Sequence, residues 1–122
     1  MTAANAERRA RFAPPPHRFE IRVQPGREAV YVRPIGELDL PGSRRLSTAI
    51  DELVETGFEH IVIDLRALTF IDCAGVRVLL SRHAAAVREG RRLSLLHGGP
   101  CIRRVFALTG TLDMLPFDRQ QA

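Results

Sequence analysis

The sequence contains no lysine, only two cysteines and no apolar run near the roughly 20 residues that a helix needs to cross a bilayer. The first residues also lack the apolar core of a signal peptide. Neither Cys73 nor Cys101 belongs to a Cys-x-x-Cys motif or has the Cys/His spacing of a zinc site. We therefore expect a cytoplasmic protein with reduced thiols, no direct membrane insertion and no cofactor.

Two further kinds of site lack their usual residues. Gly98-Gly99-Pro100 could suggest a phosphate-binding loop, but no Lys-Ser/Thr pair follows it, so a turn that starts a helix is the better interpretation. The four histidines are scattered without the spacing of metal ligands, which argues against a metal site. They are His17, His60, His83 and His97.

The net charge of +4 comes mostly from the N-terminus. Residues 1–18 carry four arginines and one glutamate, which contribute +3, so the rest of the chain is nearly neutral at +1. A nearly neutral domain without a basic stripe or interleaved aromatic residues binds nucleic acid poorly. We expect no nucleic-acid partner.

Length and composition indicate one domain. The chain has 122 residues, of which 45% are hydrophobic, and this is enough for a single core. Residues 1–17 are rich in alanine and arginine and end in Pro14-Pro15-Pro16 and His17, which argues against helix or sheet. We predict a disordered tail over residues 1–17 and one folded domain over residues 18–122.

The first part of this domain has the pattern of a β-hairpin. Apolar residues alternate from Phe19 to Val23, a Pro25-Gly26 turn follows, and a second strand-like segment covers residues 29–35. Pro34 cannot donate a hydrogen bond. We therefore expect the second strand to lie at a sheet edge there or to contain a bulge.

After the hairpin, helix-like and strand-like segments alternate. Apolar residues three and four positions apart predict helices that end near Gly57, Gly90 and Gly110. Strands are predicted over residues 61–65, 93–96 and, at an edge, 114–117. This order predicts an α/β domain with a mixed, mostly parallel sheet, an opening β-hairpin and about three to four helices.

The most informative segment is residues 61–75, where an apolar strand leads to Asp72-Cys73-Ala74-Gly75 at the start of a predicted helix. The free backbone N–H groups of a helix start favour a carboxylate or a bound anion. A ligand-binding or modifiable side chain would be well placed there. The plainer alternative is that Asp72 only caps the helix and that Cys73 is a small buried residue.

Three separated segments occur in an order typical of one family. They are Gly36-Glu37-Leu38-Asp39, Phe70-Ile71-Asp72-Cys73-Ala74-Gly75-Val76 and Val105-Phe106-Ala107-Leu108-Thr109-Gly110. With these segments the chain resembles the STAS domain, which is named for sulfate transporters and anti-sigma factor antagonists. The resemblance covers about residues 19–117.

The resemblance implies both a fold and a function. It implies helices mainly on one face of the sheet, with the loops over residues 36–39 and 70–75 side by side at one end. Antagonists of this kind bind an anti-sigma factor that is also a GHKL-type serine kinase, and thereby control sigma-factor-dependent transcription. The implied partner-binding residues are Glu37, Asp39, Asp72, Cys73, Ala74, Gly75, Val76 and Arg77.

One position departs from the family pattern. In such antagonists, phosphorylation of a serine directly after the motif aspartate blocks binding, and in this chain that position is Cys73. A thiol is not a substrate for ordinary serine kinase chemistry, so we expect no phosphorylation at residue 73. Oxidation of Cys73 could replace phosphate as a redox switch, and an inert small side chain is the simpler interpretation.

Two alternatives stay open beside the antagonist function. The missing serine also suits a non-phosphorylated scaffold subunit of a transport ATPase or a signalling complex. A thiol-dependent enzyme would use Cys73 at the helix start, with His60 or His83 as the base. His83 lies ten residues further along the helix, roughly 15 Å at about 1.5 Å per residue, and His60 begins the preceding strand, so we expect no enzyme.

Overall fold

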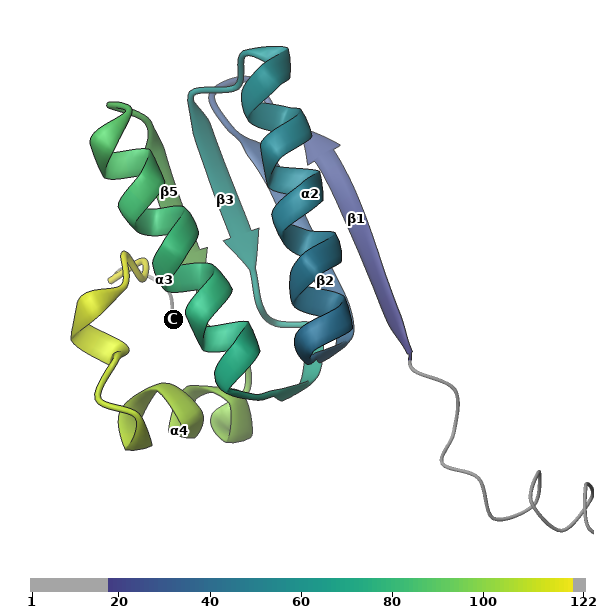
Figure 1. Cartoon of the computed structure of the whole chain (residues 1–122), viewed down its shortest axis with the longest axis vertical. Helices are drawn as coiled ribbons and strands as arrows, with labels where there is room; N and C mark the ends of the chain where they lie inside the picture. Colours follow the sequence, from purple (N-terminus) through teal and green to yellow (C-terminus); the bar gives the residue numbers. More distant parts are fainter. Residues whose placement is uncertain (1–17, 120–122) are drawn as a thin grey trace, which may run out of the picture.

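The computed structural model describes residues 18–119, so the tail predicted over residues 1–17 lies outside the described part of the chain. The elements are β1 (Phe19–Pro25), β2 (Val30–Leu38), α2 (Leu40–Thr56), β3 (His60–Asp64), β4 (Leu68–Ile71), α3 (Cys73–Arg88), β5 (Arg92–Leu96), α4 (Pro100–Leu108) and the 3-10 helix η1 (Leu112–Met114). Figure 1 shows their arrangement. The predicted alternation of strands and helices after a hairpin is confirmed.

The strands form one mixed sheet of five strands. β1 and β2 pair antiparallel as the predicted hairpin, whereas β2 with β3 and β3 with β5 pair parallel, in the order β1-β2-β3-β5. The short β4 pairs parallel with the end of β2, beyond the residues that pair with β3. The expected mixed, mostly parallel sheet is therefore confirmed.

The helices α2 and α3 lie side by side on one face of this sheet, and α4 lies near one end of it (Figure 1). Alternate strand residues are buried toward α2 and α3, as Val30 and Val32 of β2 and Ile61 and Ile63 of β3 show. The helices contribute Leu46, Ile50, Leu79, Ile102 and Phe106 to the same core. As the resemblance implied, helices cover mainly one face, and within residues 18–119 the other face carries none.

Both long helices begin and end close to the predicted positions. α2 follows the cap residue Asp39 and ends at Gly57, whose φ of 105° is a left-handed conformation that glycine adopts at little cost. α3 follows the cap residue Asp72 and ends just before Gly90. Because both helices run antiparallel to the strands that they follow, they start at the same end of the sheet.

Strand β2 lies inside the sheet, but at Pro34 it is paired only on the β1 side, so the predicted local edge is confirmed. β2 pairs with β1 on one side, and on the other side it pairs with β3 as far as Val32 and with β4 from Gly36. The N–H of Gly36 donates to Ala67 on the β4 side. Since a strand alternates, the nitrogen of Pro34 faces the gap between these two pairings, where no donor is needed. An irregularity also follows close by, because the β2–β4 register shifts between Gly36 and Glu37.

The C-terminal segment also differs from its prediction as an edge strand over residues 114–117. It forms η1 and then a single parallel bridge between Leu95 and Phe117. Pro116 has no N–H, and its carbonyl accepts a hydrogen bond from Leu95 at 3.0 Å, so a regular ladder cannot extend through it. The ring of Phe117 stacks on His97 with their centroids 4.0 Å apart. Packing of this ring therefore adds to the two backbone hydrogen bonds that the bridge makes with Leu95.

Candidate functional site

The end of β2 and the end of β4 meet at one end of the sheet. Glu37 pairs with Phe70 and Leu38 pairs with Ile71 in parallel register. One residue further, the backbone N–H of Asp72 donates to the carbonyl oxygen of Leu38 at 3.3 Å. The two loops that the family resemblance placed side by side are therefore adjacent, and each leads directly into a long helix.

These two helices start with the same local arrangement. In each, an aspartate precedes the helix, and its Oδ1 accepts a hydrogen bond from the N–H of a glycine three residues later. The distance is 3.0 Å between Asp39 and Gly42, and 3.1 Å between Asp72 and Gly75. Such bonds satisfy N–H groups that a helix start leaves without a partner. Both carboxylates therefore act as helix caps while remaining partly exposed.

The same two glycines let the helices approach the end of β2 closely. A Cβ atom at Gly42 would stand 2.8 Å from the carbonyl oxygen of Glu37, and one at Gly75 would stand 2.6 Å from that of Leu38. Neither distance leaves room for a side chain. The two Asp-x-x-Gly sequences therefore dock both helices on consecutive carbonyls of one strand, and this docking positions the first turn of α3.

Cys73 is the first residue of α3 and is exposed, so the plainer interpretation of a buried cysteine is wrong. Arg77 is also exposed and lies one turn further on the same side of the helix. Ala74 is half-buried. Val76 is only 5% exposed and packs in the core, and Gly75 is buried beside it. The side chains of Cys73 and Arg77 therefore face solvent, whereas Gly75 and Val76 lie on the buried side of the same helical turn.

Two exposed apolar side chains near these residues were absent from the predicted site. Phe70 is 47% exposed, and Leu40, the first residue of α2, is 50% exposed. Leu68 and Phe70 pair with consecutive residues of β2, which makes Thr69 an extra residue in β4. A bulge of this kind changes the alternation of side chains. Phe70 consequently reaches the surface while Leu68 stays buried.

Leu68, Phe70 and Ile71 are all apolar, yet only Leu68 and Ile71 are buried. The sequence did contain a signal. In a regular strand, residues 68 and 70 share one face and residue 71 lies on the other, so the three side chains cannot all enter one core. A strand that buries Leu68 and Ile71 on the same side must contain an irregularity, and Phe70 is the residue that it exposes.

The two histidines considered as bases lie away from Cys73. His60 begins β3 at the far end of the sheet, and its Nε2 lies 3.0 Å from Oγ of Ser94. Most of the length of β2 separates His60 from Cys73, which is more than about 20 Å at about 3.3 Å per residue. His83 is partly buried ten residues further along α3. This geometry gives neither histidine direct access to the thiol.

Residues 18–119 contain no group of three or more His, Cys, Asp or Glu side chains placed to hold a metal ion. Over the same residues, no helix is both long enough and apolar enough to cross a membrane.

The exposed and half-exposed residues at this end of the sheet form what we name the candidate partner surface. It consists of Glu37, Asp39, Leu40, Phe70, Asp72, Cys73 and Arg77. Three carboxylates and one guanidinium give it a formal charge of −2, around two exposed apolar side chains. A surface of this composition can bind another protein. Two of its carboxylates, those of Asp39 and Asp72, already cap helices, and the third, that of Glu37, lies beside exposed apolar side chains.

The sheet order, the helices on one face and the paired helix starts together define a family. The chain matches the STAS domain over residues 18–121, and it belongs to the STAS domain family. It is similar to the anti-sigma F factor antagonist of Paenibacillus polymyxa, with 29% identity over 99 residues that cover 80% of this chain and 85% of that protein.

Solved structures show the same relationship. An anti-sigma factor antagonist from Mycobacterium paratuberculosis has a TM-score of 0.71 at 26% identity, over 86% of this chain and 89% of that one. The anti-sigma factor antagonist SpoIIAA in its unphosphorylated form has a TM-score of 0.66 at 25% identity, over 84% and 90% of the two chains. SpoIIAA of Bacillus in the phosphorylated form has a TM-score of 0.62 at 27% identity, over 83% and 89%. The family resemblance found in the sequence is confirmed.

Proposed function

We propose that the protein is a cytoplasmic regulator that binds an anti-sigma factor of the GHKL-type serine kinase class and thereby controls sigma-factor-dependent transcription. The observation that carries this proposal is the similarity to anti-sigma factor antagonists over most of the chain, in both sequence and fold. In this proposal the protein acts by binding and not by catalysis.

The candidate partner surface supports the proposal by its composition. Exposed aromatic side chains often act as anchors in protein interfaces, and Phe70 is such a side chain near the end of β4. Leu40 adds a second apolar group. The surrounding formal charge of −2 favours a partner that places basic residues around an apolar pocket.

Residue 73 supports a specific form of this function, in which binding is not switched by phosphorylation at that position. The relative SpoIIAA exists in a phosphorylated form, and in antagonists of this family the phosphorylated serine follows the motif aspartate. A phosphate would add roughly −1.5 to −2 charges there and oppose a partner that suits the neutral side chain. Cys73 lacks the hydroxyl group, so the protein would stay in its binding form.

A second candidate function is that of a scaffold subunit in a transport ATPase or a signalling complex. The cysteine at position 73 favours this function as well, because a scaffold needs no phosphorylatable residue there. Both functions would use the candidate partner surface. The identity of the partner therefore separates them.

The test is affinity purification of the tagged chain from its own host, together with three variants. Cys73→Ser restores a hydroxyl group at the family position, and Phe70→Ala removes the aromatic anchor. Val87→Ala is the matched control, because Val87 is an exposed apolar residue, 65% exposed, near the opposite end of α3. Mass spectrometry identifies the recovered proteins and any phosphate at residue 73.

We expect the unaltered chain and Val87→Ala to recover the same anti-sigma factor. Phe70→Ala should recover at least about tenfold less of it. Cys73→Ser should acquire phosphate and lose the partner. Recovery of a membrane ATPase as a stoichiometric partner would support the scaffold function instead. If neither class of protein is recovered, the anti-sigma function is rejected while the family assignment stands.

A further inference from the structure

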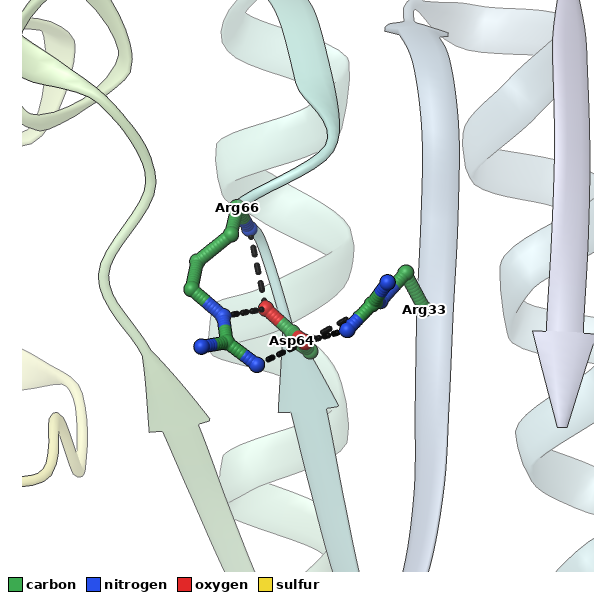
Figure 2. A network of polar contacts seen from close by, with 3 residues as sticks. All are labelled: Arg33, Asp64 and Arg66. Atoms are coloured by element: carbon green, nitrogen blue, oxygen red, sulfur yellow. Dashed lines mark hydrogen bonds and ion pairs between the residues drawn. The ribbon is translucent and has the colours of Figure 1, made fainter. Parts of the chain in front are cut away.

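A polar cluster lies on the face of the sheet that α2 and α3 leave open. In β2, Val32 is buried toward the helices, so its neighbour Arg33 points to the opposite face. In β3 the same alternation places Ile63 in the core and Asp64 on the open face. Figure 2 shows Arg33, Asp64 and Arg66 together in front of the strands, with the helices behind them.

Asp64 is a buried carboxylate that two arginines saturate with hydrogen bonds. Its side chain is 3% exposed. Oδ1 accepts from the backbone N–H of Arg66 at 3.0 Å and from its Nε at 2.9 Å. Oδ2 accepts from Nη2 of Arg66 at 2.9 Å and from Nε of Arg33 at 3.1 Å, and it forms an ion pair with Nη2 of Arg33 at 2.9 Å. The carboxylate therefore holds both guanidinium groups in place (Figure 2).

This carboxylate stays ionised despite its position. Burial by itself would raise the pKa of Asp64, because it disfavours the charged form. The hydrogen bonds from the side chain and backbone of Arg66 and from Arg33 outweigh burial and hold the pKa below its usual value. Asp64 is therefore a fixed negative charge that positions two positive ones.

The cluster holds more positive charge than Asp64 needs. One bidentate arginine is enough to pair a carboxylate, and Arg66 already provides that pairing. Arg33 comes from another strand to the same Oδ2, so the two Nη2 atoms cannot be further apart than twice 2.9 Å. Two like charges this close repel each other, and the single negative charge of Asp64 offsets only one of them.

Both arginines also keep hydrogen-bond donors for a ligand. Their side chains are 45% exposed for Arg33 and 57% exposed for Arg66. A guanidinium group has five N–H donors, and Asp64 uses only those on Nε and Nη2 of each. The remaining donors are thus held in a rigid pair next to solvent.

The same residues line a cavity of about 390 Å³ between β1, β2 and the end of β3. This volume lies within the range of small-molecule sites, roughly 300–1,000 Å³. Arg22 of β1 also lines the cavity, so three guanidinium groups stand against the one carboxylate of Asp64, a formal charge of +2. Arg22 contacts Glu20 as well, but both side chains are mostly exposed, and such a pair is weak. Tyr31 is 45% exposed and adds an aromatic ring to the wall.

We propose that this cavity binds a small organic phosphate ester. A phosphate monoester carries roughly −1.5 to −2 charges at neutral pH, which balances the charge of the lining, whereas a carboxylate would leave part of it unpaired. Guanidinium groups bind phosphate oxygens through paired hydrogen bonds. The volume leaves room for an organic group beside the ring of Tyr31. In this site Arg22, Arg33 and Arg66 bind the ligand, and Asp64 is a positioning residue.

The proposed site is independent of the proposed function. None of the residues that line the cavity belongs to the candidate partner surface. The cavity lies on the open face of the sheet, whereas the partner surface lies at the end of β2 and β4 where the helices start. Failure of either proposal would therefore leave the other intact.

The probe for this site is phenyl phosphate, which combines one phosphate monoester with one aromatic ring. Binding is measured by calorimetry and by amide NMR shifts, beside inorganic phosphate and benzoate as comparison anions. Arg33→Gln and Arg66→Gln each leave Asp64 with one arginine partner, and Arg22→Gln changes a side chain that is 68% exposed. Arg88→Gln makes the same charge change on α3, behind the sheet, and is the control.

We expect phenyl phosphate to bind with a Kd below about 1 mM, more tightly than benzoate or inorganic phosphate, and to shift the amides of Tyr31, Arg33 and Arg66. Each cavity variant should weaken binding about tenfold or more, and Arg88→Gln should change it less than about twofold. Where Arg33→Gln or Arg66→Gln does not fold, Arg22→Gln decides.

Three outcomes would overturn the proposal. The first is a titration with phenyl phosphate that does not saturate. The second is equal weakening by Arg88→Gln and by the cavity variants, which would mean that only the net charge matters. The third is binding of a synthetic poly-glutamate peptide at the cavity without binding of phenyl phosphate, which would make this face a docking surface for an acidic protein segment.

Discussion

The carbonyl oxygen of Leu38 lies only 2.6 Å from the position that a Cβ atom would take at Gly75. The same oxygen accepts the hydrogen bond from the backbone N–H of Asp72. One carbonyl at the end of β2 therefore positions both the cap residue of α3 and the close approach of its first turn. The exposed position of Cys73, between these two residues, follows from this contact.

We expect Gly75→Ser to lower the free energy of unfolding by about 2 kcal/mol or more, because the added Cβ meets a backbone carbonyl and the side chain of Ile71. Gly99→Ser is the matched control. Nothing lies within 4 Å of a Cβ at Gly99, its φ is −64°, and serine is a good cap for α4. Urea unfolding of the control should change by less than about 0.5 kcal/mol or show a gain. Equal losses in the two variants would refute the contact.

Asp72→Ala should destabilise the protein by about 1 kcal/mol, because the N–H of Gly75 loses the oxygen that caps it. Asp72→Asn keeps an acceptor oxygen and should lose less than half of that amount. Thermal unfolding of both variants gives the comparison. A loss as large for asparagine as for alanine would mean that the negative charge of Asp72, and not its hydrogen bond, stabilises the helix start.

Phe70→Ala should change the free energy of unfolding by less than about 1 kcal/mol, because the side chain is 47% exposed. Phe106→Ala should cost about 3–5 kcal/mol, because that ring is fully buried. Chemical denaturation measures both. A large loss of stability for Phe70→Ala would show that the main role of this ring is in the core. Its effect on partner recovery would then follow from unfolding and not from a lost contact with the partner.

Asp64→Asn should make the free energy of unfolding depend less on pH in the acid range, below about pH 4. Although burial raises the pKa of Asp64, hydrogen bonds from Arg66 and Arg33 outweigh it, so the folded-state pKa lies below the unfolded value of about 3.9. The ionised carboxylate therefore stabilises the fold above about pH 4, and this contribution is lost as the pH falls through the lowered pKa. At pH 7 the variant should be the less stable protein, and the difference should shrink below about pH 4. A difference that stays constant from pH 7 to pH 2 would contradict this role.

The helix starts and ends could be predicted from the sequence because each depends on residues within one turn. Asp72 caps an N–H three residues away, and Gly57 ends α2 through its own conformation. The family motif around Cys73 could be recognised for the same reason, as a continuous run of residues. The eight residues predicted to bind a partner remain a prediction, and the structure adds that Val76 is buried among them.

The sequence by itself determined the alternation of strands and helices after the hairpin, and it determined the family. Tertiary structure alone decided which side chains reach the surface and which distant ones meet. The extra residue in β4 exposes Phe70 only because of its register with β2. Arg33 and Asp64 are 31 positions apart and meet because β2 and β3 are neighbours in the sheet. Short sequence patterns predict hydrogen bonds within one helical turn. Strand pairing, in contrast, brings together residues far apart in the sequence, and their spacing along the chain does not indicate that they will be in contact.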